Sequence, residues 1–152
     1  MINIRIVCVG NLKERFWVEA CDEYKKRLSK FCKLTIVEVE EQNKLKEPAR
    51  ILQREGEDIL KQLGANPVLM AIEGNQLSSE EFSNFIEKQK LLSSELTFVI
   101  GGSYGVSEEV KKNIKTKLSF GKATFPHNLA RVMLLEQLYR AFMLESGAKY
   151  HK

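Results

Sequence analysis

Short apolar runs alternate with amphipathic stretches along the chain, and this alternation limits the possible folds more than any other feature. Five runs are rich in β-branched and aromatic residues, which predicts strands at 2–9, 34–39, 68–72, 96–100 and 118–120. The stretches between them repeat apolar residues every three or four positions, which predicts helices at 14–31, 48–64, from 78 onward, 107–115 and 128–145. Strands separated by helices predict an α/β fold, a mostly parallel sheet with helices on both faces.

Three of the predicted helices begin with recognisable start signals. Pro48 suits the first turn of a helix, where its missing N–H costs nothing. Ser78 with Glu81 has the spacing of a capping box, in which each side chain bonds the other residue's backbone. Ser107 is the expected cap of the helix that follows it.

The length and composition of the chain fit a single domain, and its net charge is compatible with a nucleic-acid partner. At 152 residues and 43% apolar content, residues 1–152 are predicted to form a single domain. The net charge of +4 permits a nucleic-acid partner without requiring one.

Cysteine use and the N-terminal sequence predict a cytoplasmic protein. Cys8, Cys21 and Cys32 are widely spaced and odd in number, which fits a reducing compartment better than a disulfide scaffold. With only two histidines, no metal site is expected. Residues 1–5 predict a strand and not a signal peptide, because Arg5 interrupts the apolar run, and no stretch approaches membrane-spanning length.

Turn-forming and small residues follow three of the predicted strands, at 70–74, 101–105 and 120–125. Open parallel sheets bind ligands outside the carboxyl ends of their strands. The paired glycines Gly101-Gly102 leave backbone N–H and C=O groups accessible, so a planar or anionic ligand can approach closely. Each loop taken alone is more often only a tight turn. Together they predict one ligand site.

Several common chemistries find no support. The first strand ends in Val9-Gly10-Asn11-Leu12, which is not a dinucleotide-binding fingerprint. The chain also lacks a Walker lysine, a G-x-S-x-G motif and a cluster with metal-ligand spacing. Hydrolase, metalloenzyme and redox functions are therefore not indicated.

Six segments together resemble one family. They are Phe98-Val99-Ile100-Gly101-Gly102-Ser103-Tyr104-Gly105, Leu118-Ser119-Phe120, Thr124-Phe125-Pro126-His127, Arg131-Val132, Glu136-Gln137-Leu138-Tyr139-Arg140-Ala141 and Tyr150-His151-Lys152. The family is the RlmH type of SPOUT methyltransferase, formerly known as YbeA. Val9-Gly10, Phe16-Trp17 and Tyr24-Lys25-Lys26-Arg27-Leu28 are similar as well, so the resemblance covers essentially the whole chain.

The resemblance implies methyl transfer from S-adenosylmethionine to N3 of a pseudouridine, number 1915 of 23S ribosomal RNA. It further implies that a homodimer acts on the assembled ribosome, and that the C-terminal segment forms a trefoil knot. By the same resemblance, cofactor contacts fall on Met70, Gly101, Phe120, Gly121, Lys122, Ala123, Thr124 and Phe125. The family often has Leu where Met70 stands, and either side chain provides an apolar wall.

Four residues are candidates for the catalytic groups. An imide nitrogen must lose its proton before it is methylated, so a base or an anion-stabilising donor is expected. His127, Arg131, Tyr150 and His151 are the groups available. Each has an alternative role: His127 could cap the following helix, Arg131 could pair with a glutamate on a solvated helix face, and the tail could be a frayed end. A non-catalytic RNA- or nucleotide-binding domain, or a methyltransferase with a different RNA target, is the alternative function.

Overall fold

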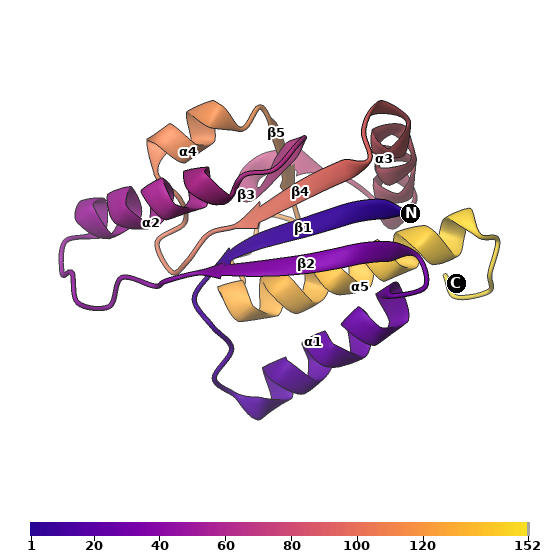
Figure 1. The fold of residues 1–152 in the computed structure, drawn as a ribbon, viewed down its shortest axis with the longest axis horizontal. Helices are drawn as coiled ribbons and strands as arrows, with labels where there is room; N and C mark the ends of the chain where they lie inside the picture. The colour runs from indigo at the N-terminus through magenta and orange to yellow at the C-terminus, as the bar shows by residue number, and fades with distance from the viewer. Residues whose placement is uncertain (152) are drawn as a thin grey trace.

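The alternating pattern folds as a five-stranded sheet between two layers of helices in the computed structural model, which describes residues 1–151 (Figure 1). The strands are β1 (Ile2–Val9), β2 (Cys32–Val39), β3 (Pro67–Gln76), β4 (Glu95–Ile100) and β5 (Thr116–Ser119). Their order is β2-β1-β4-β3-β5, and every neighbouring pair is parallel. This confirms the predicted α/β class.

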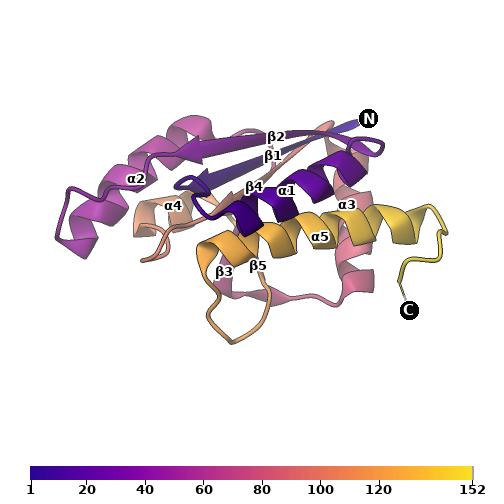
Figure 2. The same ribbon diagram turned by 90° about the horizontal axis from the view of Figure 1, so that it is seen from below.

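Helices cover both faces of the sheet, as the sequence predicts (Figures 1 and 2). They are α1 (Arg15–Leu28), α2 (Pro48–Gln62), α3 (Ser79–Leu92), α4 (Glu108–Asn113) and α5 (His127–Glu145). One face carries α2 and α4, and the other carries α1, α3 and α5. Each helical crossover carries the chain from the carboxyl end of one strand to the amino end of the next. All five strands therefore present their carboxyl ends on one side of the molecule.

The predicted helix starts are confirmed. Ser78 Oγ accepts the Glu81 N–H at 3.1 Å, and the Glu81 carboxylate accepts the Ser78 N–H at 2.8 Å. Pro48 occupies the first turn of α2, and Ser107 Oγ accepts the Val110 N–H at 3.2 Å. Such caps satisfy backbone donors that have no partner within the helix, and each is worth about 1 kcal/mol.

Several boundaries differ from the prediction because strand pairing decides them. β5 begins at Thr116, two residues earlier than predicted, since its first residues pair with Val68 and Leu69. α4 consequently ends at Asn113. β3 is longer than predicted because it rejoins β5 at Asn75 after an irregularity.

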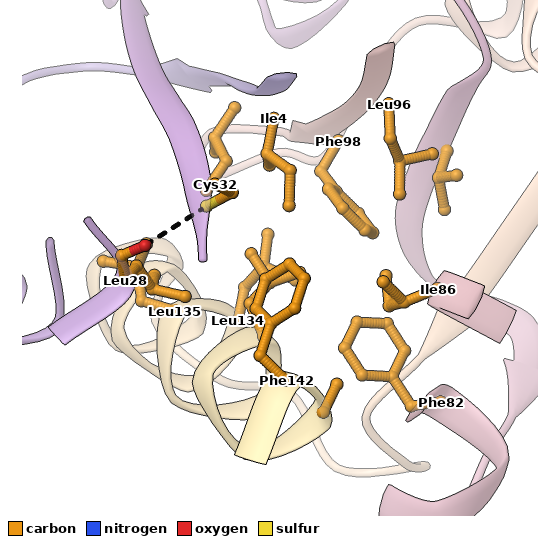
Figure 3. Close-up of a cluster of buried hydrophobic side chains, with 14 of the residues drawn as sticks. Ile4, Leu28, Cys32, Phe82, Ile86, Leu96, Phe98, Leu134, Leu135 and Phe142 are labelled. Atoms are coloured by element: carbon orange, nitrogen blue, oxygen red, sulfur yellow. Dashed lines mark hydrogen bonds between the residues drawn. The ribbon is translucent and has the colours of Figure 1, made fainter. Parts of the chain in front are cut away.

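The core below the sheet packs α5 against three neighbours (Figure 3). Leu134, Leu135 and Phe142 of α5 lie under the sheet residues Ile4 and Phe98, and all are buried. Further contacts come from α1 and α3 through Leu28, Phe82 and Ile86. Burying one such side chain stabilises the fold by roughly 1.5–3 kcal/mol. This packing fixes α5, and with it the position of His127 at the helix start.

The three cysteines are part of this buried structure. Each is a free thiol, and Cys32 Sγ donates to the Leu28 carbonyl at 3.7 Å. Burial raises the pKa of Cys8 and of Cys32 to about 11, so both are uncharged at neutral pH. None of the helices in residues 1–151 is long and apolar enough to span a bilayer. The knotted path implied by the resemblance stays a prediction.

Candidate functional site

The carboxyl ends of β3, β4 and β5 open into a cavity of about 810 Å³. Its walls come from residues 70–73, 100–106 and most of 119–127, with Lys111 of α4 and Ala130 of α5 completing them. Pockets for small organic ligands usually measure roughly 300–1,000 Å³. The three predicted loops therefore meet around one cavity of suitable size.

A bulge in β3 forms the first wall. Both Met70 and Asn75 lie opposite Leu118 of β5, so the residues between them are pushed out of the ladder towards the cavity. A Cβ on Gly74 would lie 2.6 Å from Leu118 backbone atoms. Only glycine lets the two strands approach this closely, which explains Gly74 at the end of the bulge.

The glycine loop after β4 forms the second wall. The Gly105 N–H donates to the Gly102 carbonyl at 3.0 Å and closes a tight turn, with Gly105 at φ +82°. A Cβ on Gly101 would lie 2.6 Å from the Gly105 carbonyl oxygen. Gly101 is thus required by closure of the loop on itself.

The loop between β5 and α5 forms the third wall. Ser119 Oγ accepts the Gly121 N–H at 3.0 Å and donates to the Gly121 carbonyl at 2.9 Å, which fixes the start of this loop. Seven of the eight predicted cofactor residues line the cavity: Met70, Gly101, Phe120, Gly121, Ala123, Thr124 and Phe125. Lys122 is exposed and does not line it.

An ion pair at the cavity wall escaped the sequence prediction. Lys111 Nζ lies 3.1 Å from the Glu73 carboxylate. The pKa of Glu73 is lowered below its ordinary value, mainly because its carboxylate accepts a hydrogen bond from the Glu73 backbone N–H. The hydrogen bond from Lys111 lowers it further. In the sequence Lys111 is one of several lysines in 111–117, and nothing there distinguishes it from a solvated side chain. Ser119 was missed for a similar reason, because its role depends on the local loop geometry.

His127 lies in the cavity wall at the first residue of α5. The residue before it, Pro126, is the N-cap, and no side-chain cap bond is present there. The ring is therefore not used as a helix cap. Of the four candidate catalytic residues, His127 is the one that borders this cavity.

Arg131 lies one turn further along α5 and is only 2% exposed. Its Nη1 donates to the Glu38 carboxylate at 2.7 Å, and its Nη2 donates to the Gly10 carbonyl at 3.1 Å. These contacts tie α5 to the ends of β1 and β2. In this position Arg131 borders neither the cavity nor a solvated helix face.

The tail folds back on the far half of α5. Tyr150 Oη donates to the Glu136 carboxylate at 3.0 Å. The pKa of Tyr150 is raised mainly by burial of its hydroxyl and, to a smaller extent, by this bond. The His151 ring lies 3.0 Å from Arg140 Nη1 and 2.6 Å from Glu80 Oε1. At 1.5 Å per helical residue, Arg140 is roughly 20 Å along α5 from His127. The tail is thus ordered but distant from its own cavity; its third residue, Lys152, lies outside the described residues.

Metal chemistry has no matching geometry in the described part of the chain. Residues 1–151 contain no group of three or more His, Cys, Asp or Glu side chains placed to hold a metal ion. The site instead consists of glycine-rich backbone, apolar and hydroxyl side chains, the Glu73–Lys111 ion pair and His127.

A parallel sheet with a cavity of about 810 Å³ at the ends of β3, β4 and β5 is typical of an α/β protein that binds a small organic ligand. Two solved structures share this fold. A probable methylase family protein from Haemophilus influenzae Rd KW20 aligns with 96% of this chain and 67% of its own, at TM-score 0.56 and 14% identity. A putative methyltransferase from Legionella pneumophila, solved with the bound cofactor SAM, aligns with 93% of this chain and 66% of its own, at TM-score 0.52 and 10% identity.

Sequence comparison identifies the family. The family model described as "Predicted SPOUT methyltransferase" matches residues 2–151. A protein named Ribosomal RNA large subunit methyltransferase H from Clostridium botulinum (strain Kyoto / Type A2) is 50% identical, over 99% of this chain and 100% of its own length. A protein of the same name from Caldicellulosiruptor saccharolyticus is 44% identical, over 98% and 99%. The chain belongs to the SPOUT methyltransferase family, as the sequence motifs predicted.

Proposed function

We propose that this protein transfers a methyl group from S-adenosylmethionine to N3 of a pseudouridine in 23S ribosomal RNA, on the assembled ribosome and in the cytoplasm. The observation that carries the proposal is the single cavity formed by three loops at the strand ends. Full-length relatives named as large-subunit ribosomal RNA methyltransferases support RNA as the substrate. The buried free thiols support a reducing compartment.

The cavity has the chemistry that S-adenosylmethionine requires. This compound is the methyl donor of the SPOUT family. Met70, Ile72 and Phe125 offer apolar surface for a purine ring, and Gly101 and Gly121 leave backbone groups open for hydrogen bonds to its edge. Lys122, which is exposed beside this loop, is free to meet RNA phosphate.

The reaction depends mainly on alignment. Bound S-adenosylmethionine supplies a sulfonium methyl group, which is already a good electrophile. The chain must hold the attacking nitrogen in line with that methyl and accept the imide proton. His127 fits the second task, since it borders the cavity and neither ring nitrogen is bonded within residues 1–151. Arg131 supports it indirectly by fixing α5.

A homodimer would bring the tail to an active site. Tyr150 and His151 lie far from their own chain's cavity. We therefore propose that they act in catalysis at the cavity of a second copy of the chain. α5 supports self-association because Val132, Met133 and Met143 remain partly exposed on a helix that is apolar on most sides. Twofold symmetry would give each copy one completed site. In both copies residues 1–152 are proposed to act as one domain.

The alternative is a non-catalytic domain that binds RNA or a nucleotide with the same loops. Calorimetric titration with S-adenosylmethionine separates the two, because the methyltransferase binds it and a simple RNA-binding domain does not.

Activity is then measured on assembled ribosomal particles and on a short free hairpin of the same sequence, with light scattering reporting the oligomeric state. Methylation of particles in preference to the hairpin, by a dimer, supports the proposal. Absence of binding, full methylation of the hairpin, or a monomer at micromolar concentration contradicts the corresponding part of it.

A further inference from the structure

The end of β1 places a carboxylate opposite His127. Gly10 has φ +86°, and a Cβ built on it would lie 3.6 Å from Glu41 Oε2 and 3.8 Å from His127 Nε2. The two side chains therefore border the same small space. Neither the His127 ring nor the Glu41 carboxylate has a hydrogen-bond partner elsewhere in the described chain, residues 1–151. Both groups are half-buried.

This space lies where two concavities meet. In the sheet, β1 is between β2 and β4, so Gly10 separates the end of β2 from the glycine loop of the cofactor cavity. His127 belongs to the cavity wall, and a second concavity of about 470 Å³ runs from Gly10 and Asn11 to Glu41 and Asn43. Gly10 and the two side chains beside it thus lie between the two concavities.

The loop that carries Glu41 is held by a buried carboxylate. Glu55 of α2 is only 3% exposed, and its Oε2 accepts the Gln42 N–H at 3.1 Å. Its other oxygen would lie 3.3 Å from a Cβ on Gly102. Glu55 thus lies between the loop after β2 and the glycine loop. Its bond to Gln42 anchors the backbone next to Glu41 to α2.

We propose that Glu41 is a positioning residue for His127 in the methyl transfer, a proposal that rests on the function proposed above. His127 Nε2 accepts the imide proton as the N–H bond breaks. The nitrogen electron pair forms the bond to the methyl carbon, and the C–S electron pair returns to sulfur. Glu41 acts on the ring through its charge, without a hydrogen bond, and stabilises the positive charge that His127 acquires. Carboxylate–histidine pairs serve this purpose in other proton transfers.

Other charged groups that border these concavities and the neighbouring end of β2 make partly opposing contributions. They come from the ends of β1 and β2, from α5 and from the far cavity wall: Lys13, Glu38, Glu40, Arg131, Glu73 and Lys111. Glu38 is already paired with Arg131, and Glu73 with Lys111. Glu41 is the carboxylate that shares the space beside Gly10 with the His127 ring.

The test measures the protonation of His127 directly, in the protein without cofactor. The chain has two histidines, so a His151→Gln variant assigns the two ring C2 proton signals in an NMR titration. Glu41→Gln removes the facing charge and keeps the side-chain shape. Glu47→Gln, six residues further along the same loop and exposed, is the matched control for net charge. Two groups that lie 3.6 Å and 3.8 Å from one point are at most roughly 7 Å apart, and a unit charge at that distance changes the midpoint by roughly 0.5–1 pH unit.

We expect Glu41→Gln to lower the His127 midpoint by that amount and Glu47→Gln to change it much less. The sign follows because losing a negative charge makes the imidazolium less stable. In single-turnover assays the acidic limb of the pH profile should move to lower pH in Glu41→Gln, with a smaller maximum rate, and Glu41→Asp should restore part of that rate. Equal midpoints in the two glutamine variants overturn the role of Glu41. Failure of the wild-type protein to bind S-adenosylmethionine overturns the proposed function instead.

Discussion

A substitution of Gly101 should affect both the stability of the fold and the shape of the cavity. In Gly101→Ala, the new Cβ lies 2.6 Å from the Gly105 carbonyl oxygen, about 0.8 Å inside ordinary van der Waals contact. Both atoms belong to backbone or lie directly on it, so neither can rotate away. The glycine loop must open by most of that distance. Overpacking of this kind costs roughly 1–3 kcal/mol, which lowers Tm by roughly 3–10 °C in a chain of this size.

The same displacement should weaken cofactor binding. Losing or stretching two backbone hydrogen bonds, each worth roughly 1 kcal/mol, reduces affinity by roughly 10- to 100-fold. Gly147→Ala is the matched control: Gly147 also needs a conformation that disfavours side chains, at φ +74°, but its Cβ meets open space outside the cavity. It should lose about 1 kcal/mol of stability and keep its affinity. Calorimetry and thermal unfolding measure both quantities. Wild-type affinity in Gly101→Ala would refute this account of the loop.

Three further variants test other parts of the structure. Arg131→Met should lower the free energy of unfolding by roughly 2–4 kcal/mol, because it removes the buried bonds to Glu38 and Gly10; unchanged stability in urea would contradict this. Burial raises the pKa of Glu55, so its ionised form opposes folding. Glu55→Gln should therefore be more stable than wild type at pH 8, and the gain should fade below the ordinary carboxyl pKa; a gain that grows towards acid pH would reverse the sign. Deleting residues 150–152 should preserve cofactor affinity and reduce single-turnover methyl transfer at saturating ribosomes; a rate that recovers at saturation would indicate a phosphate contact only.

The strand–helix alternation and the location of the cavity were predictable because both depend on local patterns. The first strand, the capping box at Ser78 and the three loops follow from periodicity, cap chemistry and glycine placement within a few residues of sequence. The common direction of the strands then follows from the intervening helices. These features need no knowledge of distant contacts.

The parts that were not predicted depend on long-range pairing. The β3 bulge exists because the strand returns to β5 after leaving it. Arg131 is buried with its partner Glu38, which lies 93 residues away in the sequence. His151 contacts Glu80, which lies 71 residues away. Nothing in the neighbouring residues of either side chain indicates such a partner. The proximity of Glu41 and His127 to Gly10 is hidden in the sequence for the same reason.

Mass mapping of 23S ribosomal RNA from cells with and without the gene is the decisive test of methyl transfer by this protein. One pseudouridine is expected to lose a single methyl group when the gene is deleted. The wild-type gene should restore that methyl group, and Gly101→Val, which displaces the glycine loop at the cofactor cavity, should not. An unchanged modification pattern in the deletion strain, or full restoration by Gly101→Val, would contradict the claim that this cavity performs the methyl transfer.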